Sequence, residues 1–410
     1  MSDHNPESLI IVEAKRILVE AGAAVLENSA LLVEGETILA VDTPDRLMNM
    51  SGRVIPRIRL GDLTLLPGMI DCHVHLGYEE AQDRRSPMEG STQEAFLTAL
   101  MLYNARKLLR AGVTTIRELG SSRQLGSTVR DVISKGWSPG PRVLSANEPL
   151  TTTGGHAWFL GGECDSIDEI RKAVRNHHKS GADLIKIMVT GGGLTSGSVP
   201  WRAQFSQQEV DSVVEEASRL GMPVAAHVHG SEGIAIAVKS GVTTLEHCTW
   251  MGEGGRIGNR VDTDVLQEIV DRGIFVCPTA SSRWGMMDSE RRDSKIRTVA
   301  IMHEAGVHLI AGTDAGIEHV PHDSYAQGLH WLQQCGMSTL EVLAAATSNA
   351  AHACAISKSA GTLAVGKFAD IIAVTGDPRK DLEVLAKPVW VMARGKQVHD
   401  HHLVVHPPQL

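Results

Sequence analysis

The sequence predicts an α/β fold: a (β/α)₈ barrel (TIM barrel) with a small sheet domain formed from both ends of the chain. Eight apolar runs rich in Val, Ile and Thr alternate with helical stretches over roughly 65–357. Both chain ends instead carry short β-rich runs without a long helical pattern. The composition, 42% hydrophobic and 21% charged, is that of a folded globular chain.

The two ends of the chain have the same local pattern. Residues 9–60 alternate short β-rich runs with turn residues, and 361–376 and 388–400 do the same. Such runs are typical of small antiparallel strand sets. We expect one sheet domain from both ends, with the middle of the chain inserted between them.

The middle of the chain repeats a strand and then a helix. Ser206, three residues before Glu209, forms a capping box that opens one helix. Eight such units are the signature of a (β/α)₈ barrel. A doubly wound open sheet is the alternative, but no G-x-G-x-x-G follows the first run. The runs are 65–77, 112–120, 140–148, 182–192, 223–230, 242–250, 273–280 and 307–316, and expected helices include 92–111, 166–180, 206–220 and 263–272.

Charge, hydropathy and cysteine spacing exclude several protein classes. The net charge is −9 and no basic cluster stands out, which argues against nucleic-acid binding. No run of 18 apolar residues predicts a membrane span, and the N-terminus lacks the pattern of a secretory signal. The six cysteines form no Cys-x-x-Cys pair, so we expect free thiols and a cytoplasmic protein.

Histidine and carboxylate side chains gather at the predicted strand ends. In a barrel, the carboxyl ends of the strands carry the functional groups. Side chains alternate along a strand, so a histidine pair at i, i+2 presents two imidazoles on one face. These ligand types suit zinc and similar divalent metals. The residues are His73 and His75, His227 and His229, His247, and Asp314.

Lys186 lies inside the apolar run LIKIM, where burying an ammonium is costly. One interpretation is a lysine that snorkels to the mouth of the barrel. The other is a nucleophilic amine of depressed pKa that takes up carbon dioxide. The resulting carbamate is an anionic oxygen ligand able to bridge two metals, and the neighbouring histidines favour this second interpretation.

Several motifs in order resemble those of the amidohydrolase superfamily. They are PGMIDCHVHLG, ADLIKIMVTGGG, the histidines in AAHVHG and LEHC, and AGTDAG. Within that superfamily the chain is similar to the imidazolonepropionase-like group, which includes prolidase-like dipeptidases and ochratoxin-type amidases. TTTGGHAWFLGGECD at 151–165 and the tail at 345–374 also match that group.

The resemblance implies a binuclear site and a two-domain chain. Two divalent ions, with zinc favoured, are expected. A β-sandwich of residues 1–64 and 359–410 would flank a barrel of residues 65–358. The implied ligands are His73 and His75 for the more buried ion, carboxylated Lys186 as the bridge, His227 and His247 for the second ion, and Asp314 for the first ion and for proton transfer.

Two further histidines are assigned to the substrate. His156 lies in a Gly-Gly-His loop and is predicted either to bind the tetrahedral oxyanion or to make a structural hydrogen bond. Many dipeptidases of the group have Tyr where this chain has His229, which leaves room for an ochratoxin-like amidase. A strand rise of about 3.3 Å per residue predicts an offset of about 6–7 Å between His227 and His229. We therefore expect His229 to contact substrate and not metal.

The predicted activity is hydrolysis of the amide bond of an N-acyl amino acid or dipeptide by a metal-bridging hydroxide. Alternatives are hydrolysis of a cyclic amide, as in imidazolonepropionase, hydrolysis of a carbamate or urea, or a non-catalytic metal-binding protein on an enzyme scaffold. The expected partner is a small-molecule amide, with no nucleic acid or membrane, and the chain is expected to form a homo-oligomer. The charged run DSERRDSKIR at 288–297 is expected to be a solvated helix face.

Overall fold

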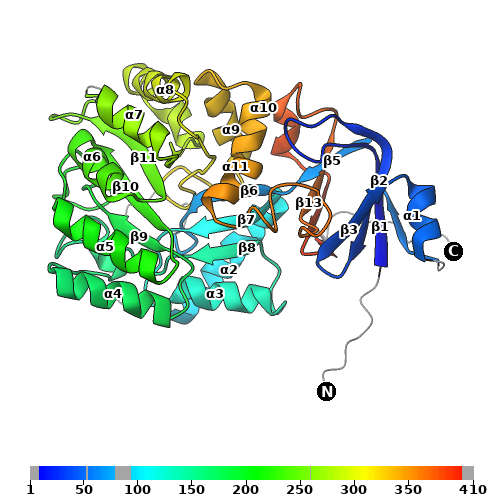
Figure 1. Cartoon of the computed structure of the whole chain (residues 1–410), viewed down its shortest axis with the longest axis horizontal. Coiled ribbons are helices and arrows are strands. Elements are labelled where there is room, and N and C mark those ends of the chain that lie inside the picture. Colours follow the sequence, from blue (N-terminus) through cyan, green and yellow to red (C-terminus); the bar gives the residue numbers. More distant parts are fainter. Residues whose placement is uncertain (1–8, 52–53, 79–93, 259, 399–410) are drawn as a thin grey trace.

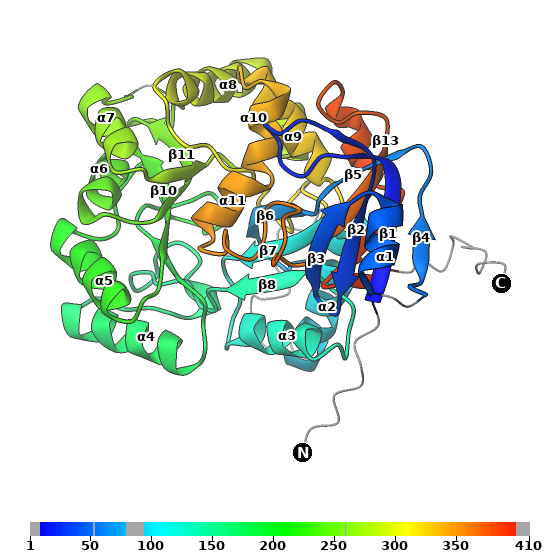
Figure 2. The same ribbon diagram turned by 45° about the vertical axis from the view of Figure 1, so that its right-hand side comes forward.

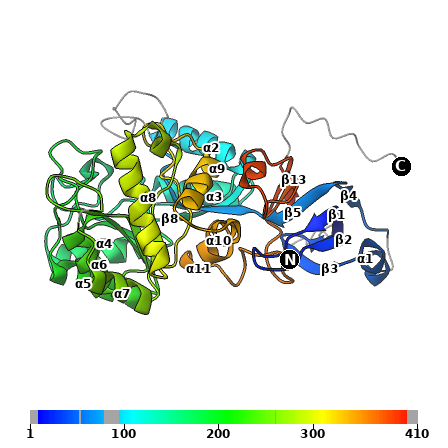
Figure 3. The same ribbon diagram turned by 90° about the horizontal axis from the view of Figure 1, so that it is seen from above.

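The computed structural model describes residues 9–51, 54–78, 94–258 and 260–398, and it has an α/β fold. One region is a sheet at one end of the molecule, and the other is a set of parallel strands covered by helices (Figure 1). Seen from above, β1, β2 and β3 lie at the opposite end of the molecule from helices α4 to α7 (Figure 3). Across the described residues, no helix has the length and apolar composition needed to cross a membrane.

The end sheet confirms that both ends of the chain contribute to one sheet. Its order is β15-β14-β13-β5-β1-β2-β3, and β4 pairs with β1. Most neighbours are antiparallel, as expected, but β1 runs parallel to β4 and β5. Helix α1 (Pro44–Ser51) packs on it. The strands are β1 (Leu9–Ile17), β2 (Leu26–Glu34), β3 (Thr37–Asp42), β4 (Arg57–Arg59), β5 (Leu63–Pro67), β13 (Ile371–Thr375), β14 (Trp390–Ala393) and β15 (Lys396–Gln397).

The predicted run 65–77 divides at Gly68 between the two regions. Pro67 ends β5 of the end sheet, and Met69 begins the first parallel strand. A Cβ at position 68 would lie 2.2 Å from the Thr114 hydroxyl oxygen. Only glycine fits where the chain passes this closely from one sheet to the next.

The parallel strands form two sheets of orders β6-β7-β8 and β12-β11-β10-β9. The residues of β6, β7 and β9 are all buried, as expected for strands covered by helices (Figure 2). All six cysteines are free, as predicted, and the structure shows that all of them are buried. The strands are β6 (Met69–Val74), β7 (Val113–Glu118), β8 (Arg142–Ser145), β9 (Ile185–Met188), β10 (Val224–Gly230), β11 (Thr244–Met251) and β12 (Phe275–Cys277).

Helices follow the parallel strands along the chain. The four helices expected from the sequence agree with the structure to within about two residues at each end. The Ser206 backbone N–H donates to the Glu209 carboxylate at 2.7 Å, which confirms the capping box. The helices are α2 (Glu94–Arg110), α3 (Leu125–Ser134), α4 (Ile167–Lys179), α5 (Gln207–Arg219), α6 (Ser231–Ser240), α7 (Thr263–Asp271), α8 (Ser289–Glu304), α9 (Tyr325–Gln334), α10 (Thr339–Ala345) and α11 (Ser348–Ala353), with short 3₁₀ turns η1 (Trp158–Leu160), η2 (Ser282–Met286) and η3 (Leu382–Ala386).

The eighth predicted run, 307–316, is held by isolated bridges. Leu309 bridges Val276 of β12, and Ala315 bridges Val74 of β6, both in parallel orientation. A further parallel bridge joins Leu150, beyond β8, to Ile187 of β9. These bridges bring the ends of all the parallel strands into one region.

Candidate active site

The structure brings the predicted ligands together at the carboxyl ends of the parallel strands. His73 lies in β6, Lys186 in β9 and His247 in β11. His227 and His229 lie in β10. The histidines come from segments far apart in the sequence, and with His75 and Asp314 they form two adjacent clusters of donor atoms.

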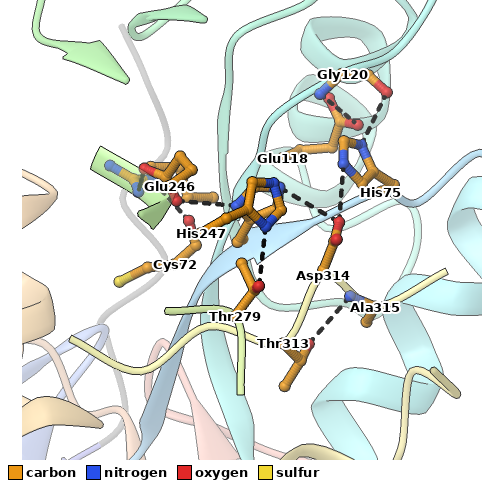
Figure 4. Close-up of polar contacts among 12 residues, drawn as sticks. Cys72, His75, Glu118, Gly120, Glu246, His247, Thr279, Thr313, Asp314 and Ala315 are labelled. Carbon is orange, nitrogen blue, oxygen red and sulfur yellow. Dashed lines mark hydrogen bonds and ion pairs between the residues drawn. The ribbon is translucent and has the colours of Figure 1, made fainter. Parts of the chain in front are cut away.

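The first cluster consists of His73, His75 and Asp314, whose ligand atoms all lie within 4.8 Å of one another. The Nε2 atoms of His73 and His75 are 3.4 and 3.3 Å from Oδ1 of Asp314. The other ring nitrogen of each histidine also has a partner. His73 Nδ1 is 2.9 Å from Glu246 Oε2. His75 Nδ1 is 3.4 Å from the carbonyl oxygen of Gly120 (Figure 4). Such partners fix the orientation of a ring so that its free nitrogen faces a metal position.

The second cluster consists of His227, His229 and His247, again with ligand atoms within 4.8 Å of one another. His247 Nδ1 is 2.9 Å from the Thr279 hydroxyl (Figure 4). His229 Nδ1 is 3.0 Å from the Thr249 hydroxyl. The rings of His73 and His247 are 5.1 Å apart between centroids, so the two clusters are neighbours.

The expected offset of about 6–7 Å between His227 and His229 is wrong. Their ring centroids are 4.7 Å apart and their planes are nearly perpendicular, at 88°. The pairing register of β10 with β11 shifts between Val228 and Gly230, so the end of β10 departs from regular strand geometry. Distance alone therefore does not exclude His229 from binding the same ion as His227.

Burial lowers the pKa of four histidines in the two clusters. It lowers the pKa of His73 to about 4 and that of His229 to about 3, and it lowers those of His227 and His247 well below the ordinary value. Burial alone would raise the pKa of Asp314, but electrostatic attraction by His73 and a hydrogen bond with His75 hold that pKa below its usual range. Neutral imidazoles beside an ionised carboxylate are the protonation states that bind a divalent cation.

Lys186 is 1% exposed, so its side chain does not reach solvent as a snorkelling lysine would. Burial lowers its pKa to about 8, although the nearby carboxylates of Glu246 and Asp314 oppose this. Within the described part of the chain, no carboxylate lies within 4.0 Å of its ammonium. A buried amine of lowered pKa beside the ligand clusters is a suitable nucleophile.

Glu246 is a site residue that the strand pattern did not identify. Its carboxylate accepts hydrogen bonds from Arg117 and Thr244 and pairs with His73. In a regular strand, side chains alternate between the two faces, so Glu246 would point away from a site that His247 faces. Both side chains reach the site, because the backbone of His247 departs from strand geometry with a φ of 66°. Asp314 and Thr279 also have positive φ, at 63° and 50°. Backbone strain of this kind concentrates at functional sites.

One sequence signal pointed toward Glu246. It is an acidic residue within the apolar run VTTLEHCTW, just as Lys186 is a basic residue within LIKIM. Arg117, within GVTTIRELG, is another such residue, and it is the partner of Glu246. A charged residue in an apolar run signals a buried ion pair or a functional group.

His156 lies beside the second cluster. It is 6% exposed, and its ring centroid is 4.6 Å from that of His227. Its Nδ1 atom is buried without a hydrogen-bond partner among the residues that the structure describes. A Cβ at Gly192 would come within 2.3 Å of His156 Nε2, so glycine there makes room for the ring.

Comparison with known proteins identifies the family. The model of the amidohydrolase family matches residues 64–398. Ochratoxinase from Aspergillus niger is 29% identical over 421 aligned positions, covering 92% of this chain and 84% of that enzyme. Imidazolonepropionase from Symbiobacterium thermophilum is 24% identical over 412 positions, covering 90% of this chain and 91% of that enzyme.

A crystal structure of a Xaa-Pro dipeptidase with bound methionine superposes with a TM-score of 0.84 and 29% identity, covering 96% of this chain and all of that one (100%). These findings agree with the resemblance seen in the sequence motifs. The chain belongs to the amidohydrolase family, in its imidazolonepropionase-like group, and is a hydrolase of carbon–nitrogen bonds.

Proposed function

We propose that this protein is a binuclear metal-dependent amidase or peptidase that cleaves N-acyl amino acids or dipeptides and releases the C-terminal amino acid. The observation that carries the proposal is the pair of neighbouring three-donor clusters, His73/His75/Asp314 and His227/His229/His247. Two adjacent donor sets are what a two-metal hydrolase requires.

The donor chemistry of the clusters fits divalent transition ions such as zinc. His73, His75 and Asp314 would hold the first ion, and His227 and His247 the second. Lys186, once carboxylated, would supply an anionic oxygen to both. The fit is supported by ring nitrogens that are neutral and whose second nitrogens already have partners, such as Glu246 and Thr279.

The bound ions and Asp314 would have different roles in amide hydrolysis. The bound ions would lower the pKa of a water molecule and polarise the scissile carbonyl. Asp314 is ionised and can accept the proton of the attacking water. Because a carboxyl group of low pKa holds a proton weakly, Asp314 can then deliver that proton to the departing nitrogen.

We assign substrate contacts to His156 and His229. Each ring lies 4.6 Å between centroids from a ring of the second cluster: His156 from His227, and His229 from His247. We assign His156 as a hydrogen-bond donor to the oxyanion and His229 as a contact to the scissile carbonyl or substrate carboxylate.

The names of two relatives support the substrate class: the ochratoxinase and the Xaa-Pro dipeptidase with bound methionine. The similarity to imidazolonepropionase leaves a cyclic amide as the second candidate. Lys186 favours the first candidate, because a bridging carbamate belongs to a binuclear site and cyclic-amide hydrolysis generally occurs at a mononuclear site that lacks this lysine.

The proposal includes a closed (β/α)₈ barrel and a β-sandwich from the chain ends. The bridges Leu309–Val276, Ala315–Val74 and Leu150–Ile187 support closure. The sequence boundaries are 1–64 with 359–410 for the sandwich and 65–358 for the barrel. Because β5 ends at Pro67, we place the first boundary at Gly68.

The proposal is tested by loading the protein with zinc, counting bound ions by elemental analysis and screening N-acetyl amino acids and dipeptides for turnover. We expect about two ions per chain and release of the amino acid. Lys186→Ala should lose metal and most turnover, with partial recovery when a small carboxylic acid is added, whereas Lys239→Ala on the exposed face of α6 should match the parent. Full activity without metal, or near-normal turnover and metal content in Lys186→Ala, would overturn the proposal.

A further inference from the structure

The charged run 288–297 led us to expect a solvated helix face, but the side chain of Lys295 is partly buried. This residue lies on α8, which packs against β11. Its Nζ is 4.8 Å from the ring centroid of Trp284, which is itself 1% exposed. The ammonium therefore lies against the protein interior, over an aromatic face.

The position of Lys295 adjoins the second cluster. Lys295 lines a small cavity together with His247 and Thr249, and Thr249 is the hydroxyl partner of His229. Lys295 thus reaches the candidate active site from a helix outside the strand ends.

The charge of Lys295 has no described counter-ion. Among the residues that the structure describes, no carboxylate lies within 4.0 Å of its ammonium. The nearby charges of Arg291 and Arg283 have the same sign, whereas the carboxylate of Asp314, more than 4.0 Å away, attracts the ammonium. Burial and these arginines lower the pKa of Lys295 to about 7. A partly buried cation without a direct ion-pair partner is stabilised when an anion binds beside it.

We propose that Lys295 is a specificity-determining residue that binds the free carboxylate of the substrate, on the amino acid that hydrolysis releases. In an N-acyl amino acid this carboxylate is only a few bonds from the scissile carbonyl, so a cation beside the second cluster is suitably placed for it. The flexible stem of lysine allows the ammonium to move from the Trp284 ring to the ligand. This inference rests on the proposed function and specifies which end of the substrate the site selects.

Paired substrates test this assignment on the metal-loaded protein. Lys295→Met keeps an apolar stem over Trp284 and removes the charge. We expect kcat/KM for an N-acetyl amino acid to fall about 10- to 100-fold, as for the loss of a hydrogen bond to a charged group. The corresponding carboxamide, which lacks the charge, should be turned over equally by parent and variant. Lys295→Arg should retain most of the preference for the acid, and Arg297→Met, which removes the same charge from the exposed side of α8, should retain all of it.

A binding measurement separates this proposal from the proposed function. Calorimetric titration with L-methionine and L-methioninamide needs no turnover. We expect the parent to prefer methionine and Lys295→Met to lose that preference. If the parent hydrolyses neither substrate but shows this pattern, the proposed function fails and the role of Lys295 stands. Equal losses of affinity or kcat/KM for the acid and the amide would overturn the role of Lys295. So would an unchanged preference for the acid in both Lys295→Met and Lys295→Gln.

Discussion

The two histidine clusters have the same number of donors but are held in different ways. Asp314 gives the first cluster a negative charge, and the ionised carboxylate of Glu246 orients His73. The second cluster contains only imidazoles, and the neutral hydroxyls of Thr279 and Thr249 orient two of them. A cation is attracted by ionised ligands and by carboxylates that are hydrogen-bonded to its histidine ligands. The first cluster should therefore bind its ion more tightly than the second.

The largest expected effect comes from Asp314, because it is both the charged ligand of the first cluster and the proposed proton carrier. Asn tolerates the positive φ of this position, so Asp314→Asn should preserve the backbone. We expect kcat to fall by about 10³- to 10⁴-fold and the first ion to be lost more readily, measured by steady-state kinetics and elemental analysis. Glu318→Gln serves as a nearby control. Near-normal kcat in Asp314→Asn at full metal content would contradict the assigned role.

The next effect concerns His229, which lies close enough to His227 for either a metal or a substrate role. We expect His229→Asn to retain about two ions while kcat/KM falls about 10²-fold, as for the loss of an oxyanion-type donor. Metal content and kinetics are measured on the same preparation. Loss of one ion would instead identify His229 as the third ligand of the second cluster, and unchanged kinetics would remove both roles.

His229 also shows where prediction from the sequence reached its limit. Residue type and spacing identified the members of both clusters, because a histidine pair at i, i+2 and a strand-end aspartate are local features. The distance between His227 and His229 depended on how β10 pairs with β11, and the register shift at that point is a tertiary feature. Local periodicity carries no information about it.

The same distinction applies to the fold. Apolar runs predicted the parallel strands β6 to β12, and helical patterns predicted α2, α4, α5 and α7, since these depend on near neighbours in the sequence. The division of the first run at Gly68 and the partial burial of Lys295 depended on what packs against them. The run 307–316 reads as a strand from its sequence, but Asp314 turns through a positive φ and only isolated bridges form.

Glu246→Gln tests whether the ionised carboxylate that pairs with His73 strengthens metal binding at the first cluster. The variant keeps an acceptor for His73 but removes the ionised carboxylate and its pairing with Arg117. We expect affinity for the first ion to weaken about 10- to 100-fold, measured by competition with a chelator. Affinity for the second ion should be nearly unchanged.

Thr279→Val is the matched change at the second cluster, because it removes the hydroxyl that orients His247 at similar volume. We expect a smaller loss of affinity, confined to the second ion, since the lost partner is neutral. Thr279→Ser, which keeps the hydroxyl, is the control. Equal losses in Glu246→Gln and Thr279→Val would contradict the idea that charge distinguishes the two clusters.

The smallest effect concerns Glu118, a buried carboxyl that interacts with His75 of the first cluster and accepts a hydrogen bond from the Gly120 N–H at 3.3 Å (Figure 4). Burial raises its pKa from 4.5 to about 7, with His75 opposing the shift. Between these two values the folded chain keeps the proton and the unfolded chain does not. The free energy of unfolding therefore falls as pH rises through this window, and the loss is complete above about pH 7.

Glu118→Gln cannot titrate, so its stability relative to the parent should increase from pH 5 to pH 8. At about 1.4 kcal/mol per pKa unit, the limiting gain is about 3 kcal/mol for the metal-free protein. Chelated samples are required, because a cation held by His75 would favour the ionised carboxylate and narrow the window. Urea unfolding at several pH values measures the effect, with exposed Glu253→Gln as the control. Parallel pH curves for parent and Glu118→Gln would show that the folded-state pKa of Glu118 is close to that of an exposed glutamate.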